Sequence, residues 1–217
     1  MRARIAAAER AAGRAPNGVT LVAAGKAQDA LAIRALYAAG QRHFGESYLQ
    51  EALRKQRMLH DLDIVWHFIG VIQSNKTRDI AAHFAWVHGV DRLKIAERLN
   101  AQRPESLPPL NVCIQVNVGG EPQKAGVVRA ELPALAAALQ RLPRLRLRGL
   151  MTLPPPSDEA EEQRRHFRAL AAAWSELKPQ GVPLDTLSMG MSGDLEAAVA
   201  EGATMVRVGT ALFGARA

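Results

Sequence analysis

The chain has very little cysteine and no long apolar run, and both absences limit what it can be. Its single cysteine, Cys113, cannot form an internal disulfide, and it lies within the apolar run 111–118. We therefore expect a buried, unreactive thiol. The apolar runs fall far short of the roughly 20 residues that span a bilayer. Residues 1–10 lack the apolar core and cleavage site of a secretory signal. Together these features predict a cytoplasmic protein without a membrane span.

Lysine and aromatic residues are also scarce. Aromatic residues make up 5% of the chain, and only six of its 28 basic residues are lysines. The net charge is +7, but the basic residues are spread along the sequence and do not alternate with aromatic ones. Nucleic-acid-binding modules usually show a basic patch or stripe, and some add stacking aromatics. We therefore predict a solvated basic surface and no nucleic-acid function, although the charge can help attract a phosphorylated ligand.

The chain does contain a regular alternation of short apolar runs and amphipathic segments. After a helix expected at 2–12, strands are expected at 19–24, 42–45, 65–70, 85–90, 110–118, 145–151, 184–188 and 204–208. The helices between them are expected at 29–39, 48–59, 75–83, 92–101, 131–142, 159–177 and 194–201. Several of the strands are nearly continuous apolar runs, as expected for strands buried on both faces.

Eight such units in about 200 residues match the small end of the (β/α)8-barrel size range. We predict an α/β protein, a single TIM-barrel domain over residues 1–217 with an extra N-terminal helix. An open doubly wound sheet is the alternative, but the first expected strand is not followed by Gly-x-Gly-x-x-Gly. In a TIM barrel, functional residues lie at the carboxyl ends of the strands.

Lys26 lies at the carboxyl end of the first expected strand. Its neighbours Gly25 and Ala27 are small, which leaves room for a bulky group at the amine. A free amine in apolar surroundings condenses readily with an aldehyde. A solvated lysine at the start of a loop is the alternative.

Two turns near the C-terminus offer groups that bind phosphate. The segment 188–193 (SMGMSG) follows the seventh expected strand, and Gly209 and Thr210 follow the eighth. Hydroxyls and glycine amides ahead of a helix bind phosphate well, and barrels commonly bind it between these two loops. Capping of the next helix by Ser192 or Asp194 would explain the first segment without a ligand.

Arg207 is expected to point into the barrel. Strand alternation places Met205 and Arg207 on one side and Val206 and Val208 on the other. If the two valines pack against the helices, the guanidinium lies inside and needs a hydrogen-bond acceptor. A carboxylate and a ligand atom such as a pyridine nitrogen are both suitable partners.

Five segments, in one order along the chain, point to a known family. They are 44–51 (FGESYLQE), 66–76 (WHFIGVIQSNK), 148–154 (RGLMTLP), 187–196 (LSMGMSGDLE) and 205–216 (MVRVGTALFGAR). These segments resemble the pyridoxal phosphate homeostasis proteins of the YggS/PROSC type, which are related to the barrel domain of alanine racemases. The resemblance implies a fold-type III barrel that holds pyridoxal 5′-phosphate (PLP) as a Schiff base on Lys26. It also implies that Arg207 faces the pyridine nitrogen and that Ser188, Gly209 and Thr210 bind the phosphate.

The chain departs from the usual family pattern at several positions, three of which bear on the expected site. Gln28 replaces a second lysine, Ser47 replaces an asparagine, and Val71 replaces a histidine. Ser47 is still expected near the cofactor, with a shorter side chain. Two further candidates for cofactor contact are Met151, at a strand end, and His67, for which a hydrogen-bonded core position is the alternative.

Three functions are compatible with these residues: a PLP carrier, an amino-acid racemase or decarboxylase, and a nucleic-acid or scaffold protein. Racemisation needs proton-transfer groups on both faces of the substrate. Related racemases draw one group from an added C-terminal domain, whereas this sequence ends at Ala217 and its two tyrosines, Tyr37 and Tyr48, fall in or beside helices. An arginine on the ring nitrogen also weakens the cofactor as an electron sink. We therefore expect a non-catalytic, monomeric PLP carrier without a metal, whose partners include PLP-dependent apoenzymes.

Overall fold

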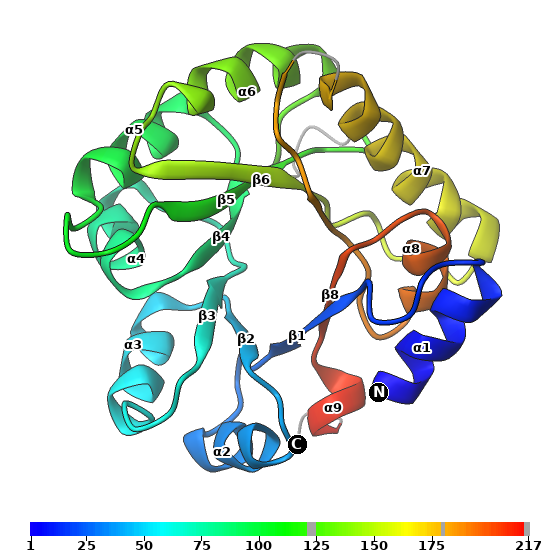
Figure 1. Ribbon diagram of the computed structural model, residues 1–217, viewed down its shortest axis with the longest axis horizontal. Coiled ribbons are helices and arrows are strands. Elements are labelled where there is room, and N and C mark those ends of the chain that lie inside the picture. The colour runs from blue at the N-terminus through cyan, green and yellow to red at the C-terminus, as the bar shows by residue number, and fades with distance from the viewer. Residues whose placement is uncertain (121–124, 179–180, 215–217) are drawn as a thin grey trace.

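Eight parallel strands form a closed barrel in a computed structural model that describes residues 1–120, 125–178 and 181–214. Neighbouring strands pair in sequence order, and β1 pairs with β8 to close the barrel (Figure 1). The strands are β1 (Thr20–Ala24), β2 (His43–Glu46), β3 (Val65–Phe68), β4 (Trp86–Val90), β5 (Leu110–Gln115), β6 (Leu145–Met151), β7 (Thr186–Ser188) and β8 (Met205–Val208). The predicted (β/α)8 barrel is confirmed, and the open sheet is excluded.

The helices form a ring outside the strands (Figure 1). They are α1 (Arg2–Ala11), α2 (Ala30–Ala38), α3 (Leu49–Met58), α4 (Thr77–His83), α5 (Leu93–Gln102), α6 (Leu132–Gln140), α7 (Ala160–Leu177), α8 (Leu195–Ala200) and α9 (Thr210–Phe213), with 3-10 turns η1 (Ser74–Lys76) and η2 (Arg129–Glu131). The extra helix α1 packs beside α8, where Arg4 and Glu196 form an ion pair. None of the described helices combines the length and apolar character needed to cross a membrane.

The main differences from the expected elements lie at strand ends. β5 stops at Gln115 instead of 118, and Val116 beyond it forms an isolated bridge with Val127. β3 ends at Phe68 and β7 begins at Thr186, each two residues inside its expected range. The short helix α9 was not expected, because four residues are too few to show a helical period.

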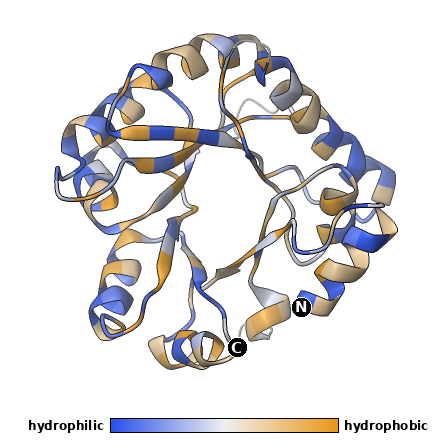
Figure 2. Cartoon of the chain, viewed as in Figure 1, coloured by the Kyte–Doolittle hydropathy of each residue, from blue (hydrophilic) through white to orange (hydrophobic). Residues whose placement is uncertain are grey.

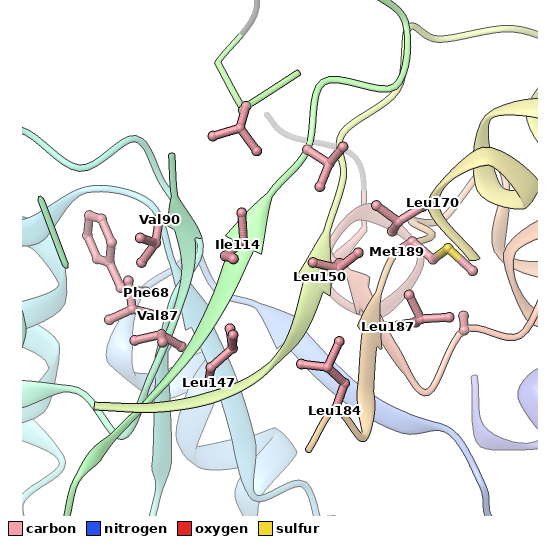
Figure 3. Packing of buried hydrophobic residues seen from close by; sticks show 14 of the residues in the cluster. Phe68, Val87, Val90, Ile114, Leu147, Leu150, Leu170, Leu184, Leu187 and Met189 are labelled. Atoms are coloured by element: carbon pink, nitrogen blue, oxygen red, sulfur yellow. The ribbon is translucent and has the colours of Figure 1, made fainter. Parts of the chain in front are cut away.

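Alternation along the strands separates two layers of packing. Side chains on the outer face belong to a large core cluster that also contains helix residues such as Leu170. Figure 3 shows Val87, Ile114, Leu150 and Leu187 among them. The helices carry both hydrophilic and hydrophobic residues, as the mixed colours of Figure 2 show. The second layer is a smaller cluster on the inner face of the strands, made of Val22, Trp86, Cys113, Met151 and Met205. Cys113 is fully buried, and burial raises the pKa of its thiol to about 12, as expected for an unreactive core cysteine.

Candidate functional site

A pocket of about 750 Å³ is lined by residues that follow the carboxyl ends of several barrel strands. Lys26 follows β1, Ser47 follows β2, and Arg207 belongs to β8. Gly209 and Thr210, just beyond β8, also line the pocket. Five residues singled out in the sequence, from the two ends of the chain, are therefore brought together around one cavity.

Arg207 reaches the pocket from inside the barrel and is only 4% exposed. Its Nη1 donates to the Ser188 Oγ at 2.6 Å, and its Nη2 donates to the Thr152 carbonyl at 2.8 Å. Neither of these partners is a carboxylate. Burial lowers the pKa of the guanidinium to about 10, which still leaves it charged at neutral pH. Val206 and Val208 pack in the outer core, so the predicted inward direction of Arg207 is confirmed.

Ser188 lies inside the barrel, fully buried, and is not among the residues lining the pocket. Its hydroxyl accepts from Arg207 and lies 2.8 Å from the Nδ1 of His88. A hydroxyl can accept one hydrogen bond and donate another. Ser188 therefore connects Arg207 to the histidine.

Three histidines continue this hydrogen-bonded chain across the barrel. The Nε2 of His88 lies 2.9 Å from the Nδ1 of His67, whose Nε2 lies 2.9 Å from the Nδ1 of His43. Burial lowers the pKa of His88 to about 3, places that of His67 well below its usual value, and also lowers that of His43. The rings are therefore neutral. If each ring donates toward His43, every linked nitrogen has a partner and Ser188 is free to donate to His88.

His67 and Met151 were considered as cofactor contacts, and neither is among the residues lining the pocket. Both ring nitrogens of His67 are occupied by its histidine neighbours, which matches the alternative of a hydrogen-bonded core histidine. Met151 is 1% exposed and packs with Trp86 and Cys113.

The loops after β7 and β8 lie against each other at one side of the pocket. The Ala211 amide donates to the Ser192 Oγ at 3.4 Å, and Ser192 and Gly193 line the pocket together with Thr210. Asp194 precedes α8 without a side-chain cap to the helix, and instead its Oδ1 accepts from the Met191 amide. The hydroxyl and the glycine backbone of this loop therefore face the cavity rather than serving only as a helix cap.

Two side chains of α3 form hydrogen bonds with the backbone of the turn that carries Lys26. The Lys55 Nζ donates to the Gly25 carbonyl at 2.6 Å, and the Glu51 Oε1 accepts from the Ala27 amide at 2.8 Å. Lys26 itself is partly buried, and its side chain lines the pocket.

The outer part of the pocket contains residues that the sequence did not mark as a site. Gln28 and Val71, two of the departures from the family pattern, both line it. Tyr48 also lines the pocket and is 64% exposed. Tyr48 immediately precedes α3, and no pattern in the sequence predicts that its side chain reaches the pocket.

Comparison with known proteins places the chain in a family. Residues 1–217 match the family model "Alanine racemase, N-terminal domain". The chain belongs to this family. It is 61% identical to the pyridoxal phosphate homeostasis protein of Pseudomonas aeruginosa, over 99% of this chain and 92% of that protein. It is 52% identical to the Escherichia coli K12 protein of the same name, over 100% and 94%. The expected family relationship is confirmed.

Solved structures in the same comparison agree with this membership. PipY of Synechococcus elongatus PCC7942, solved with PLP bound, is 43% identical with a TM-score of 0.87, covering 99% of this chain and 100% of that one. Alanine racemase from Corynebacterium glutamicum has a TM-score of 0.72 over 99% of this chain and 61% of its own. At 20% identity it shows only that the barrel fold is shared.

Several residues of this family member's site were missed at the sequence level, and some had a usable signal. His88 was missed, and Ser188 was expected at the phosphate and not inside the barrel. Their strand neighbours Val87 and Leu187 pack outward, so alternation alone would have turned both side chains inward. Lys55 and Glu51 gave a weaker signal. Their spacing of four residues predicts only a surface ion pair on a helix.

Proposed function

We propose that this protein binds PLP as a Schiff base on Lys26 and holds or delivers the cofactor within the cell, without catalysing a reaction on it. The observation that carries the proposal is the convergence of Lys26, Arg207, Gly209 and Thr210 on one pocket. Curated relatives of at least 45% identity are named pyridoxal phosphate homeostasis proteins, and PipY was solved with PLP bound.

The pocket offers a suitable group for each part of PLP. Lys26 supplies an amine for the aldehyde: its nitrogen bonds to the aldehyde carbon, and the oxygen leaves as water. Arg207 supplies a fixed donor for the pyridine nitrogen, because a guanidinium donates but accepts no hydrogen bond. Thr210 and Gly209, together with Ser192 and Gly193 across the pocket, supply hydroxyl and backbone groups for the phosphate.

We assign Ser188 a different task from the phosphate contact expected for it. Its hydroxyl already accepts from Arg207 and adjoins His88, and it does not line the pocket. Ser188 orients the guanidinium, and Ser192 takes its place at the phosphate.

A holding role fits the electrostatics of the site better than catalysis does. A protonated ring nitrogen makes PLP a stronger electron sink for reactions on amino acids, and a charged guanidinium at that nitrogen disfavours its protonation and so weakens the sink. We further propose PLP-dependent apoenzymes as the recipients and a monomer acting in the cytoplasm.

Absorbance spectroscopy and peptide mapping test the proposal. Apo protein mixed with PLP should develop the absorbance band of a Schiff base, and borohydride should abolish the band and fix the cofactor to the peptide containing Lys26. The Lys26→Ala variant should show no band. Lys76, a second lysine lining the pocket, gives the matched control, and Lys76→Ala should retain the label on Lys26. A label on Lys76 in the wild-type protein would contradict the assignment.

A further inference from the structure

The turn around Lys26 has a conformation that its own sequence does not favour. The Gln28 amide donates to the Gly25 carbonyl at 3.0 Å, which closes a turn with Lys26 and Ala27 at its centre. Ala27 has a φ of 62°, in the left-handed region. An L-residue there costs roughly 1–2 kcal/mol, and such turns favour glycine at this position. Contacts from outside the turn must therefore hold it.

Those contacts come from a buried lysine on α3. Lys55 is 1% exposed, and its ammonium has three acceptors: the Gly25 carbonyl at 2.6 Å, the Glu46 Oε1 at 2.8 Å and the Glu51 Oε1 at 2.5 Å. These three bonds use all three N–H donors of the ammonium. A buried lysine is rare unless it is paired, and here both of its ion partners lie in the same small cluster.

Glu51 completes the link to the far side of the turn. Its Oε1 accepts both from Lys55 and from the Ala27 amide, the latter at 2.8 Å. The contacts therefore run from the Gly25 carbonyl through Lys55 and Glu51 to the Ala27 amide. The two peptide groups that flank Lys26 are both held, and their planes determine the φ and ψ angles of Lys26.

Glu46 holds the side chain of Lys55 from the barrel strand β2. It is fully buried at the end of β2, and a Cβ added to Gly25 would lie only 2.8 Å from its Oε1. The close approach explains why a residue without a side chain stands next to Lys26. It also ties the position of Lys55 to the barrel wall and not only to α3.

We propose that Lys55, Glu51 and Glu46 are positioning residues that set where the Lys26 amine stands for Schiff base formation. This inference rests on the proposed function and extends it to residues that do not line the pocket. In the reaction the Lys26 nitrogen bonds to the aldehyde carbon of PLP and gives up two protons, and the aldehyde oxygen leaves as water. The three positioning residues exchange no atoms in this step. They hold the backbone from which the amine extends.

The test separates covalent capture from non-covalent binding. Stopped-flow absorbance measures how fast apo protein forms the Schiff base with PLP. Pyridoxine 5′-phosphate, which has an alcohol in place of the aldehyde, measures the affinity of the pocket without the covalent step. Because a displacement of 1 Å can cost about 100-fold in rate, Lys55→Met should slow Schiff base formation by about 10- to 100-fold. The affinity for pyridoxine 5′-phosphate should change by less than about threefold.

A pair of substitutions at Glu51 provides a second measurement that leaves the buried Lys55 in place. The side chain of Glu51 is 21% exposed. Glu51→Gln keeps an oxygen that can accept from the Ala27 amide, whereas Glu51→Ala removes it. The glutamine variant should retain most of the wild-type rate, and the alanine variant should be slowed.

Arg103→Met is the matched control for lost stability. Arg103 is another buried cation that bonds backbone carbonyls, those of Ala81 and Phe84, away from the pocket. The variant should lose stability but keep the wild-type rate of Schiff base formation.

Equal rates in wild type, Lys55→Met and Glu51→Ala would overturn the inference while leaving Lys26 as the site. So would equal losses of rate and of pyridoxine 5′-phosphate affinity. Failure of the wild-type protein to form any Schiff base on Lys26 would instead overturn the proposed function itself.

Discussion

The guanidinium of Arg207 donates a 2.6 Å hydrogen bond to the hydroxyl of Ser188, and both side chains are buried inside the barrel. The bond fixes the direction of one end of the guanidinium, and the Thr152 carbonyl fixes the other. A rigid, desolvated donor is therefore in place before any ligand arrives. Such preorganisation removes an ordering cost from binding.

Replacing Ser188 with alanine should lower the affinity of the protein for pyridoxal phosphate and for unphosphorylated pyridoxal by the same factor. The substitution leaves the Nη1 of Arg207 and the Nδ1 of His88 without their Ser188 partner, and a buried unsatisfied group costs roughly 1–3 kcal/mol. The phosphate contacts stay in place. Spectroscopic titration with the two aldehydes measures the two factors.

Thr210→Ala is the contrasting variant, because Thr210 lines the pocket after β8. A lost hydrogen bond to a charged group costs roughly 1.5–3 kcal/mol, or about 10- to 100-fold in affinity. Thr210→Ala should therefore lower the affinity for PLP by that factor and hardly change the affinity for pyridoxal. If Ser188→Ala showed this phosphate-specific pattern instead, Ser188 would bind the phosphate as the sequence first suggested.

Glu46 should make the protein less stable as the pH rises. Burial raises the pKa of Glu46 from 4.5 to about 7, against the opposing effect of Lys55. Between those two values the folded state binds a proton that the unfolded state has lost, so stability falls with increasing pH by up to about 1.4 kcal/mol per pH unit. Denaturant unfolding at pH 4.5 to 8 measures this slope. The Glu46→Gln variant lacks this titrating group, so its free energy of unfolding minus that of the wild type should increase as the pH rises over the same range. A difference that does not change with pH would contradict the assignment.

His88 should produce the opposite dependence on the acidic side. Burial lowers its pKa from 6.5 to about 3, so below pH 6.5 the unfolded state binds a proton that the folded state does not. Stability is then lost as the pH falls toward 3, again by up to about 1.4 kcal/mol per pH unit. His88→Gln, whose amide can replace the Nε2 contact, should lose less with acid than wild type.

The fold was predictable because its signals are local and repeated. The structure contains the eight strand–helix units that the periodicity and spacing predicted. Lys26 follows the first strand, as expected. The direction of Arg207 followed from alternation with Val206 and Val208. The same reasoning applied to β7 would have separated Ser188, which points inward, from Ser192, which lies in the loop four residues later.

Contacts that depend on how helices pack could not be read in this way. Lys55 reaches the Gly25 carbonyl, 30 residues away, only because α3 lies under the carboxyl ends of β1 and β2. No spacing in the sequence encodes that approach. Tyr48 is a similar case, since its place at the pocket depends on where the chain turns into α3.

Tyr48 provides the sharpest test between a carrier and an enzyme. It is a pocket residue with a proton-bearing hydroxyl, so it is a candidate for proton transfer to a substrate bound there. We expect PLP-loaded wild-type protein to show no multiple-turnover racemisation, transamination or decarboxylation of common amino acids, because Arg207 opposes protonation of the ring nitrogen. Tyr48→Phe should therefore leave the background rate unchanged. Arg207→Glu should shift the absorbance of the bound cofactor, since a carboxylate favours the protonated ring. Turnover by the wild-type protein at about 10 per second, the median for enzymes, that disappeared in Tyr48→Phe would replace the carrier with a racemase.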